Sequence, residues 1–308
     1  MLFRKPKVGI ALAGGGAKGL AHIGVLEVFE KEGIPIDIIA GTSIGAIVGG
    51  FYALKPDAVK MKNMARRFVD SEAYREMRLD KFKSEEEDNW FERIRNRLKV
   101  GLTFVEALGK SSLIQEGPVA EIFDEMFDNK TFKDMRLPFA AVALDLVSGQ
   151  DIIFKEGMVK NAVRASAAIP GIFPPVKLGG RILVDGGVTA NVPVEAARDL
   201  GADIVIGVIF GYKPSPPGKL NSSMSVILRG DELAKLKLFR MLLEEADYVI
   251  EIDTKDVHWT DFGRLDECVE MGRKAAYKHI DVLKRITKGG IFSRLFFPKK
   301  NTVSVVKF

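Results

Sequence analysis

The sequence predicts an α/β protein of three layers, in which helices cover both faces of a mostly parallel central sheet. Short apolar runs recur along the 308 residues, with helical patterns between several of them, which is typical of alternating strands and helices. The runs are almost continuously apolar, as expected for strands that are buried on both faces. We expect strands at 7–13, 36–40, 139–144, 204–210 and 248–252.

The length and composition favour one large domain. With 47% apolar residues the chain can bury a sizeable core. No stretch approaches the ~20 consecutive apolar residues of a membrane-spanning helix. The single cysteine, Cys268, excludes an intrachain disulfide and fits a reducing compartment. The apolar run at 8–12 is shorter than the ~7 to 15 residues of a signal-peptide core, so we expect a cytoplasmic protein.

A glycine-rich loop, Gly14–Gly19, follows the first predicted strand and begins a helix that runs to about Glu32. Such a loop directs backbone N–H groups outward at the positive end of a helix dipole, which predicts an anion site. The loop also fits the G-x-G-x-x-G pattern of dinucleotide-binding proteins. We reject that alternative because the available acidic residue, Asp37, lies at the start of the second strand and not near its end. A P-loop is excluded because Lys18 has no Ser or Thr beside it.

The second predicted strand runs into Gly41-Thr42-Ser43-Ile44-Gly45, and a helix from Ile44 to Leu54 follows. A serine between two glycines at a strand, sharp turn and helix is the context of a nucleophile elbow. The same five residues also fit a turn whose serine caps the next helix, so both interpretations stay open at this point. Adjacent parallel strands would bring Ser43 and the glycine loop to one sheet edge. Acyl transfer needs a nucleophile close to N–H donors in this way.

Residues 71–109 differ from the sheet pattern around them. An acidic run at 84–88 leads into Trp90, Phe91, Ile94 and Leu98 at helical spacing, which predicts an amphipathic helix. We expect a helical insertion here, either packed on the domain or acting as a lid over the active site. Glycines at 149 and at 179–180 predict two added hairpins.

The base that would activate Ser43 is not obvious, because the chain has only three histidines. His22 lies within the first predicted helix, and only His258 is placed on a loop, where a Ser-His-Asp triad could use it. Asp185-Gly186-Gly187 offers another base, since it follows a short strand at 181–184 and its glycines leave room for another backbone. Asp-Gly-Gly alone is also the sequence of an ordinary turn.

The net charge of +5 is concentrated at the C-terminus. Residues 284–308 contain seven basic residues and no acidic one, so the remainder has a net charge of −2. Three phenylalanines and a leucine lie at 292–297, and this cationic and aromatic mixture suits an anionic membrane surface. We therefore separate a main domain, 1–283, from a tail that contacts the inner face of the membrane; an edge strand at 302–308 is the alternative. Nucleic acid is not an expected partner, because the basic residues do not continue onto the main domain.

Taken in order along the chain, four elements resemble bacterial members of the patatin-like phospholipase family. The ordered set spans residues 14–187 and is specific, although each element alone is weak. The elements are Gly14-Gly15-Gly16-Ala17-Lys18-Gly19, Gly41-Thr42-Ser43-Ile44-Gly45, Ala165-Ser166-Ala167-Ala168-Ile169-Pro170 and Asp185-Gly186-Gly187.

This resemblance implies a serine acylhydrolase of phospholipase A or lysophospholipase type on a patatin-like fold. Ser43 would attack the acyl carbonyl, and Asp185 would be the general base in place of a histidine. The amides of Gly15 and Gly16 would form the oxyanion hole. The expected course is ping-pong, with an acyl-enzyme on Ser43 that water then hydrolyses.

The resemblance also implies the surroundings of the site. Gly14 and Lys18 would border it, with Lys18 beside a phosphate headgroup; a solvated lysine at the helix start is the alternative. Ser166 and Pro170 are expected to shape the pocket wall and to end a helix. No metal or other cofactor is expected, since no His/Cys cluster or EF-hand-like loop is present, so hydrolysis should be independent of calcium.

The expected partner is therefore a phospholipid or another acyl lipid. Two other functions stay open from the sequence. One is an esterase that uses a Ser-His-Asp triad through His258. The other is a non-catalytic module that binds lipid or protein on the same scaffold.

Overall fold

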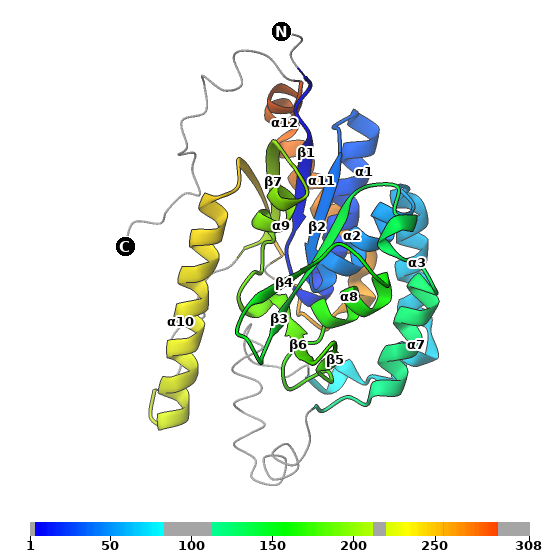
Figure 1. The fold of residues 1–308 in the computed structure, drawn as a ribbon. Coiled ribbons are helices and arrows are strands. Elements are labelled where there is room, and N and C mark those ends of the chain that lie inside the picture. Colours follow the sequence, from blue (N-terminus) through cyan, green and yellow to red (C-terminus); the bar gives the residue numbers. More distant parts are fainter. Residues whose placement is uncertain (1–3, 83–111, 212–219, 255, 289–308) are drawn as a thin grey trace.

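The computed structural model describes residues 4–82, 112–211, 220–254 and 256–288 (Figure 1). Most of the insertion expected at 71–109, and the tail from residue 289 onward, lie outside the described residues. The described residues form three layers, with one sheet between two layers of helices. No helix in these ranges is long and apolar enough to cross a membrane.

A single sheet of eight strands lies at the centre of the described residues. Its order is β5-β6-β3-β2-β1-β7-β8, with β4 paired to β3 beside this path. The path β3-β2-β1-β7-β8 is parallel throughout, whereas β4, β5 and β6 are antiparallel additions. This confirms the mostly parallel sheet predicted from the apolar runs. The strands are β1 (Val8–Leu12), β2 (Ile38–Thr42), β3 (Phe139–Asp145), β4 (Asp151–Phe154), β5 (Val176–Leu178), β6 (Arg181–Asp185), β7 (Ile204–Phe210) and β8 (Tyr248–Ile252).

The second strand begins and ends two residues later than the sequence predicted. The amide of Asp37 donates to the carbonyl of Val8 at 2.8 Å, and its carboxylate accepts from the amide of Val8 at 2.8 Å. These two bonds fix Asp37 ahead of the ladder, so β2 starts at Ile38. Because β2 then continues to Thr42, Ser43 follows the strand with no loop between them.

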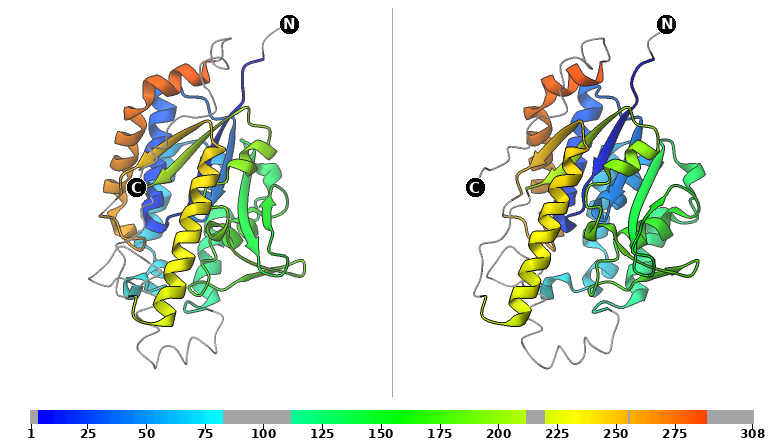
Figure 2. Two further views of the ribbon diagram at one scale, coloured as in Figure 1. Left: turned by 90° about the vertical axis from the view of Figure 1, so that its left-hand side faces the viewer. Right: turned by 60° about the vertical axis from the view of Figure 1, so that its left-hand side comes forward.

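Helices cover the two faces of the sheet unequally (Figure 2). The helices of the thicker layer are α1 (Ala21–Glu32), α2 (Ile44–Leu54), α3 (Ala58–Asp70), α4 (Glu72–Glu76), α7 (Glu116–Phe127), α8 (Val159–Ser166), α11 (Leu265–Lys278) and α12 (Ile280–Thr287). The other face is covered by α9 (Val194–Asp199) and by the C-terminal part of α10 (Ser223–Glu244). Helices on both faces confirm the predicted three-layer architecture.

Two glycines let α1 and α11 touch at the level of their backbones (Figure 2). A Cβ added to Gly24 would lie 1.9 Å from the carbonyl oxygen of Val269, and one added to Gly272 would lie 1.9 Å from that of Ala21. No side chain fits at this crossing, so the first long helix and α11 pack as one unit.

The last described helix, α12, belongs to the packed domain. Leu283 and Ile286 are buried, and the ammonium of Lys284 pairs with Glu32 at 2.6 Å. Lys284, the first basic residue of the predicted tail, therefore forms an ion pair with α1. The packed part of the chain continues at least to Thr287.

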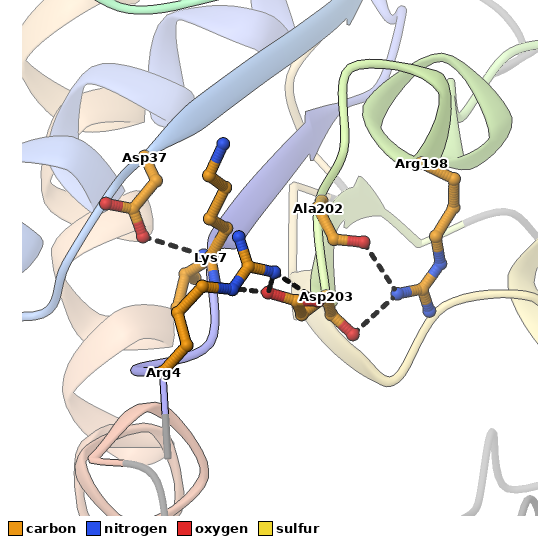
Figure 3. Close-up of polar contacts among 7 residues, drawn as sticks. Arg4, Lys7, Asp37, Arg198, Ala202 and Asp203 are labelled. Carbon is orange, nitrogen blue, oxygen red and sulfur yellow. Dashed lines mark hydrogen bonds and ion pairs between the residues drawn. The ribbon is translucent and has the colours of Figure 1, made fainter. Parts of the chain in front are cut away.

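Hydrogen-bonded side chains close the sheet edge at the amino ends of β1 and β7 (Figure 3). The carboxylate of Asp203 accepts two bonds from the Arg4 guanidinium, at 3.1 and 2.9 Å, and one from the Lys7 amide at 2.8 Å. Arg198 donates to the carbonyls of Ala202, at 3.4 Å, and of Asp203, at 2.9 Å. Backbone N–H and C=O groups that would otherwise lack partners at the start of these strands are thus hydrogen-bonded to side chains.

Candidate active site

Ser43 forms a strained turn between β2 and α2. Its φ of 56° and ψ of −126° are unusual for a residue with a side chain. A Cβ on Gly45 would lie 2.1 Å from the carbonyl oxygen of Leu12, so only glycine allows α2 to begin this close to the sheet. Ser43 occupies the N-cap position of α2 but makes no capping hydrogen bond with its side chain. The helix therefore does not use the hydroxyl.

The elbow is fixed to β3 by a second, buried serine on α8. The amide of Ser43 donates to Oγ of Ser166 at 3.0 Å, and the Ser166 hydroxyl donates to the carbonyl of Val142 at 2.6 Å. Both bonds are buried, so they hold the turn in one position. The sequence assigned Ser166 only to the pocket wall, and this bridge to the elbow was not predicted.

Asp185 ends β6 beside Ser43 and is only 5% exposed. Its carboxylate accepts a hydrogen bond from the amide of Gly187 at 2.7 Å, and the Ser43 hydroxyl lies beside it. Burial raises the pKa of Asp185 to about 6, and the Ser43 hydroxyl and the Gly187 amide oppose that rise because they favour the charged form. A Cβ on Gly186 would lie 2.4 Å from the carbonyl oxygen of Val142, so the close approach expected at Asp-Gly-Gly is present.

The glycine loop passes beside Ser43 and is fixed by close contacts. A Cβ on Gly14 would lie 3.1 Å from the Cβ of Ser43. Gly16 has a φ of 57°, and a Cβ there would lie 2.4 Å from the carbonyl oxygen of Trp259. The loop leads into a 3-10 helix, η1 (Gly16–Leu20), before α1 begins. The sequence predicted a single helix at this point, but the left-handed Gly16 imposes the tighter first turn.

Two consecutive amides of this loop, unlike their neighbours, are not hydrogen-bonded within the part of the chain that the structure describes. The amide of Gly14 donates to the carbonyl of Asn191 at 3.2 Å, and that of Ala17 donates to Trp259 at 2.7 Å. Between them, the amides of Gly15 and Gly16 have no acceptor among the described residues. Both glycines are partly exposed to solvent. Two neighbouring N–H groups are thus available to an anion beside the elbow.

His22 contacts the residues that precede and underlie the glycine loop, through a hydrogen bond to Ala13 and a ring contact with Phe210. Its Nε2 lies 2.9 Å from the carbonyl oxygen of Ala13, which can only accept, so Nε2 carries the proton. The ring packs on Phe210 at 4.8 Å between centroids, and a Cβ on Gly15 would lie 2.7 Å from that phenyl ring. Burial lowers the pKa of His22 to about 4, so the imidazole is neutral at physiological pH.

The other two histidines have partners of their own. Nδ1 of His258 lies 2.6 Å from the Thr260 hydroxyl, and Nδ1 of His279 lies 2.8 Å from the Tyr248 hydroxyl. His258 does lie on a loop, as predicted. Among the described residues, however, the Asp185 carboxylate lies beside the Ser43 hydroxyl and accepts from the Gly187 amide, and no histidine is hydrogen-bonded to it.

An apolar cavity, partly open to solvent, adjoins Ser43 and Gly16. Its walls come from α2, α3, α7, α8 and the short segments between them. The lining is aliphatic, aromatic and methionine side chains, and Arg164 is the one charged residue among the described residues that line it. Large apolar side chains in the wall include Ile47, Phe51, Met61, Phe68, Phe123 and Phe173.

Lys18 lies on η1 and is partly buried, but it does not line this cavity. Its predicted position beside a headgroup stays a prediction. The sequence did not point to Arg164, which immediately precedes the Ala165–Pro170 motif, or to Asn191, which holds Gly14. Among the described residues no three His, Cys, Asp or Glu side chains are grouped to hold a metal ion.

A strained serine, a hydrogen-bonded buried carboxylate and free backbone amides at one sheet edge are the arrangement of a serine hydrolase of the α/β class. The chain belongs to the patatin-like phospholipase family, because the model of that family matches residues 10–198. This confirms the family resemblance seen in the four motifs.

Known proteins are similar over part of their length. An uncharacterized NTE family protein of Mycobacterium tuberculosis (strain CDC 1551 / Oshkosh) is 30% identical to this chain. The similarity covers 87% of this chain and 46% of the length of that protein. Mouse patatin-like phospholipase domain-containing protein 6 is 30% identical, over 66% of this chain and 13% of its own. The chain therefore spans less than half the length of these relatives. The structure of VipD from Legionella pneumophila matches with a TM-score of 0.50 and 15% identity, over 91% of this chain and 67% of VipD, which supports the fold.

Proposed function

We propose that this chain is a serine acylhydrolase that cleaves acyl esters of phospholipids or related lipids through a dyad of Ser43 and Asp185. The observation that carries the proposal is the position of the strained Ser43 hydroxyl beside the buried carboxylate of Asp185. The apolar cavity beside Ser43 supports a substrate with acyl chains. Membership of the patatin-like phospholipase family supports a lipid ester as the substrate class.

In the acylation step, Asp185 takes the proton of Ser43 while the serine oxygen attacks the ester carbonyl. An ordinary aspartate, with a pKa of about 3.9, is a weak base for a hydroxyl. The raised pKa of Asp185, about 6, makes it a stronger base that is still mostly ionised at neutral pH. General-base assistance typically contributes ~10² to 10⁴ in rate. The amides of Gly15 and Gly16 receive the oxyanion, each donor being worth on the order of 10² to 10³.

The remaining steps use the same groups. Asp185 returns its proton to the leaving alcohol as the tetrahedral intermediate collapses, and the acyl group stays on Ser43. Asp185 then takes a proton from water as the water oxygen attacks the acyl carbonyl. When this second intermediate collapses, Asp185 returns the proton to the Ser43 oxygen, which gives a fatty acid and free serine. The cavity would hold the acyl chain through both steps.

Two variants with matched controls test the dyad. Ser43→Ala and Asp185→Asn should each abolish release of fatty acid, with the melting temperature unchanged or, for Asp185→Asn, raised, because a buried charge is removed. His258→Ala should keep turnover, since that ring is not bonded to Asp185. Retained turnover in either dyad variant would sink the mechanism, and loss in His258→Ala would point to a triad.

Covalent labelling separates an enzyme from a binding module. A fluorophosphonate probe should label folded wild-type protein at Ser43 and leave Ser43→Ala unlabelled. A module that only binds lipid has no activated serine, so folded protein that takes up no probe would favour that alternative.

Peripheral contact with the inner face of a membrane through residues 284–308 remains a prediction, because 289–308 lie outside the described residues. The ion pair of Lys284 with Glu32 leaves six of the seven basic residues for such contact. At up to about 1 kcal/mol for each basic residue near an anionic surface, they could bind it reversibly. Anionic liposomes should retain the full chain better at low salt than a chain ending at Lys288; equal retention would refute the contact.

A further inference from the structure

Arg164 lies in the last turn of α8, at the border between the apolar cavity and solvent. Its side chain is 20% exposed, and it is the one charged residue among the described residues of the cavity wall. A guanidinium beside apolar walls is poorly hydrated and therefore requires an anion nearby. Its place in the wall is not explained by any role in the dyad.

Within the described residues, Arg164 makes a single hydrogen bond. Nη2 donates to a carboxylate oxygen of Glu116, in the first turn of α7, at 2.5 Å. A guanidinium carries five N–H groups in a planar fork, so most of its donors remain available to a second anion. The Glu116 side chain is 67% exposed, so it can turn toward water without a large cost.

The position of Arg164 along α8 places it close to the elbow. Ser166, two residues further along the helix, accepts the bond from the Ser43 amide. Residues two apart on a helix point to different sides, and the Arg164 side chain lines the same cavity as Ser43. A glycerophospholipid carries its phosphate a short distance from the ester carbonyls, separated by the glycerol carbons. A lipid whose carbonyl lies at Ser43 therefore brings its phosphate within the range of a side chain as long as arginine.

We propose that Arg164 binds the phosphate of the lipid substrate, and that Glu116 occupies the guanidinium when no substrate is present. The proposal rests on the proposed function, since it names the substrate class of the same site. A phosphate offers the bidentate geometry that arginine recognises best, with a charge at least equal to that of the carboxylate it replaces. Phosphodiester lipids are then preferred over neutral esters with the same acyl chains.

Paired substrates test this on the full chain. Dioleoyl phosphatidylglycerol and dioleoylglycerol are compared in the same detergent micelles, with kcat and KM measured from released fatty acid. Arg164→Gln should lower kcat/KM for the phospholipid by about 10- to 100-fold, mainly through KM, and change that for dioleoylglycerol by less than about threefold. The kcat/KM of Arg164→Lys for the phospholipid should lie between those of wild type and Arg164→Gln, because lysine keeps the charge but not the planar fork of donors.

Two further variants act as matched controls. Glu116→Gln removes the competing carboxylate and should leave phospholipid turnover equal or faster. Lys18→Gln changes the cation that the sequence favoured and should affect both substrates alike. Equal losses on the two substrates in Arg164→Gln, or none on the phospholipid, would overturn the proposal. A phospholipid-specific loss in Lys18→Gln alone would also overturn it, by moving the phosphate to Lys18.

Inorganic phosphate distinguishes a lipid headgroup from free phosphate as the source of the anion. Inhibition of dioleoylglycerol hydrolysis that disappears in Arg164→Gln shows that free phosphate reaches the same residue. If wild type is not inhibited but the phospholipid preference is still lost in Arg164→Gln, the site accepts only lipid-borne phosphate. Inhibition that persists in Arg164→Gln contradicts the assignment. If wild type hydrolyses neither substrate faster than Ser43→Ala does, the proposed function itself fails, and not only the assignment of the phosphate site.

Discussion

The two edges of the central sheet differ in how completely their polar groups are paired. At the amino edge, Asp203 and Asp37 bind the amides of Lys7 and Val8, and Arg4 completes the closure. At the carboxyl edge, two loop amides lack acceptors among the described residues, a serine is strained and a carboxylate is buried. The second edge is therefore costly to fold, and its unpaired groups are those that could stabilise a reaction.

This contrast separates residues that maintain the fold from residues that would act on a substrate. Changes at the carboxyl edge should affect turnover more than stability, and changes at the amino edge should do the reverse. Five sets of measurements, one of them on the dyad variants above, test this separation.

After the dyad variants, the largest effect is expected from Gly16→Ala. A Cβ would meet the Trp259 carbonyl oxygen at 2.4 Å on a residue with φ of 57°, so the loop must move and its amides with it. We expect kcat to fall by about 10² to 10³, as for loss of an oxyanion donor. The matched control is Gly33→Ala, where φ is 65° but nothing lies within 4 Å of an added Cβ. It should cost about 1 kcal/mol of stability and leave kcat unchanged. Equal kcat in both variants would contradict the donor role.

The pH dependence should also distinguish the two edges. Because the pKa of Asp185 is about 6, kcat/KM should fall about tenfold for each pH unit below 6 as the base is protonated. The folded pKa lies above the value of 3.8 for a free aspartate, so ionising Asp185 opposes folding above pH 6. That opposition weakens between pH 6 and 3.8. Activity should therefore fall in this range with no loss of stability from this residue, as melting curves at each pH would show. A flat rate profile down to pH 5 would refute Asp185 as the base.

A smaller effect, on stability, is expected at the amino edge from Asp203→Ala. The change removes the acceptor for the Arg4 guanidinium and for the amide of Lys7, both on the exposed surface. We expect the free energy of unfolding to fall by about 1 to 3 kcal/mol, with kcat unchanged. Urea titrations give the first quantity and initial rates the second. A fall in kcat without a change in stability would break the separation of the edges.

The smallest effect is expected from Arg4→Ala, the partner in the same contact. The side chain of Arg4 is 65% exposed, and exposed ion pairs contribute less than about 1 kcal/mol. Urea titration of this variant beside Asp203→Ala separates the ion pair from the bond to the Lys7 amide. Equal losses in both variants would mean that the guanidinium, and not the backbone contact, carries the stability.

The sequence could predict those parts of the molecule that depend on local pattern. The buried strands were found because their apolar runs are continuous, as in Ile204–Phe210. Ser43 and Asp185 were found because glycines mark the turns that each requires. The order of the motifs then placed the two residues at one sheet edge, where the Ser43 hydroxyl lies beside the Asp185 carboxylate.

Features that depend on distant contacts could not be predicted. The start of β2 is set by the bonds between Asp37 and Val8, which exist only once β1 and β2 are paired. Arg164 faces the cavity because α7 and α8 pack together, and no local pattern on α8 records that. The interaction of His22 with the Ala13 carbonyl is equally invisible, since a histidine in an apolar helix usually indicates only burial.

The crossing of α1 and α11 at Gly24 and Gly272 has a consequence for the order of folding. β1 lies between β2 and β7, and α1 needs α11 to cover it, so the glycine loop and the elbow depend on residues made much later. During synthesis, the segment that carries Ser43 must wait, with apolar surface exposed, for the C-terminal half of the domain. Such high contact order predicts slow folding and a need for chaperones while the chain is incomplete. We therefore expect the elbow and the glycine loop to reach their final positions only after α11 has docked on α1.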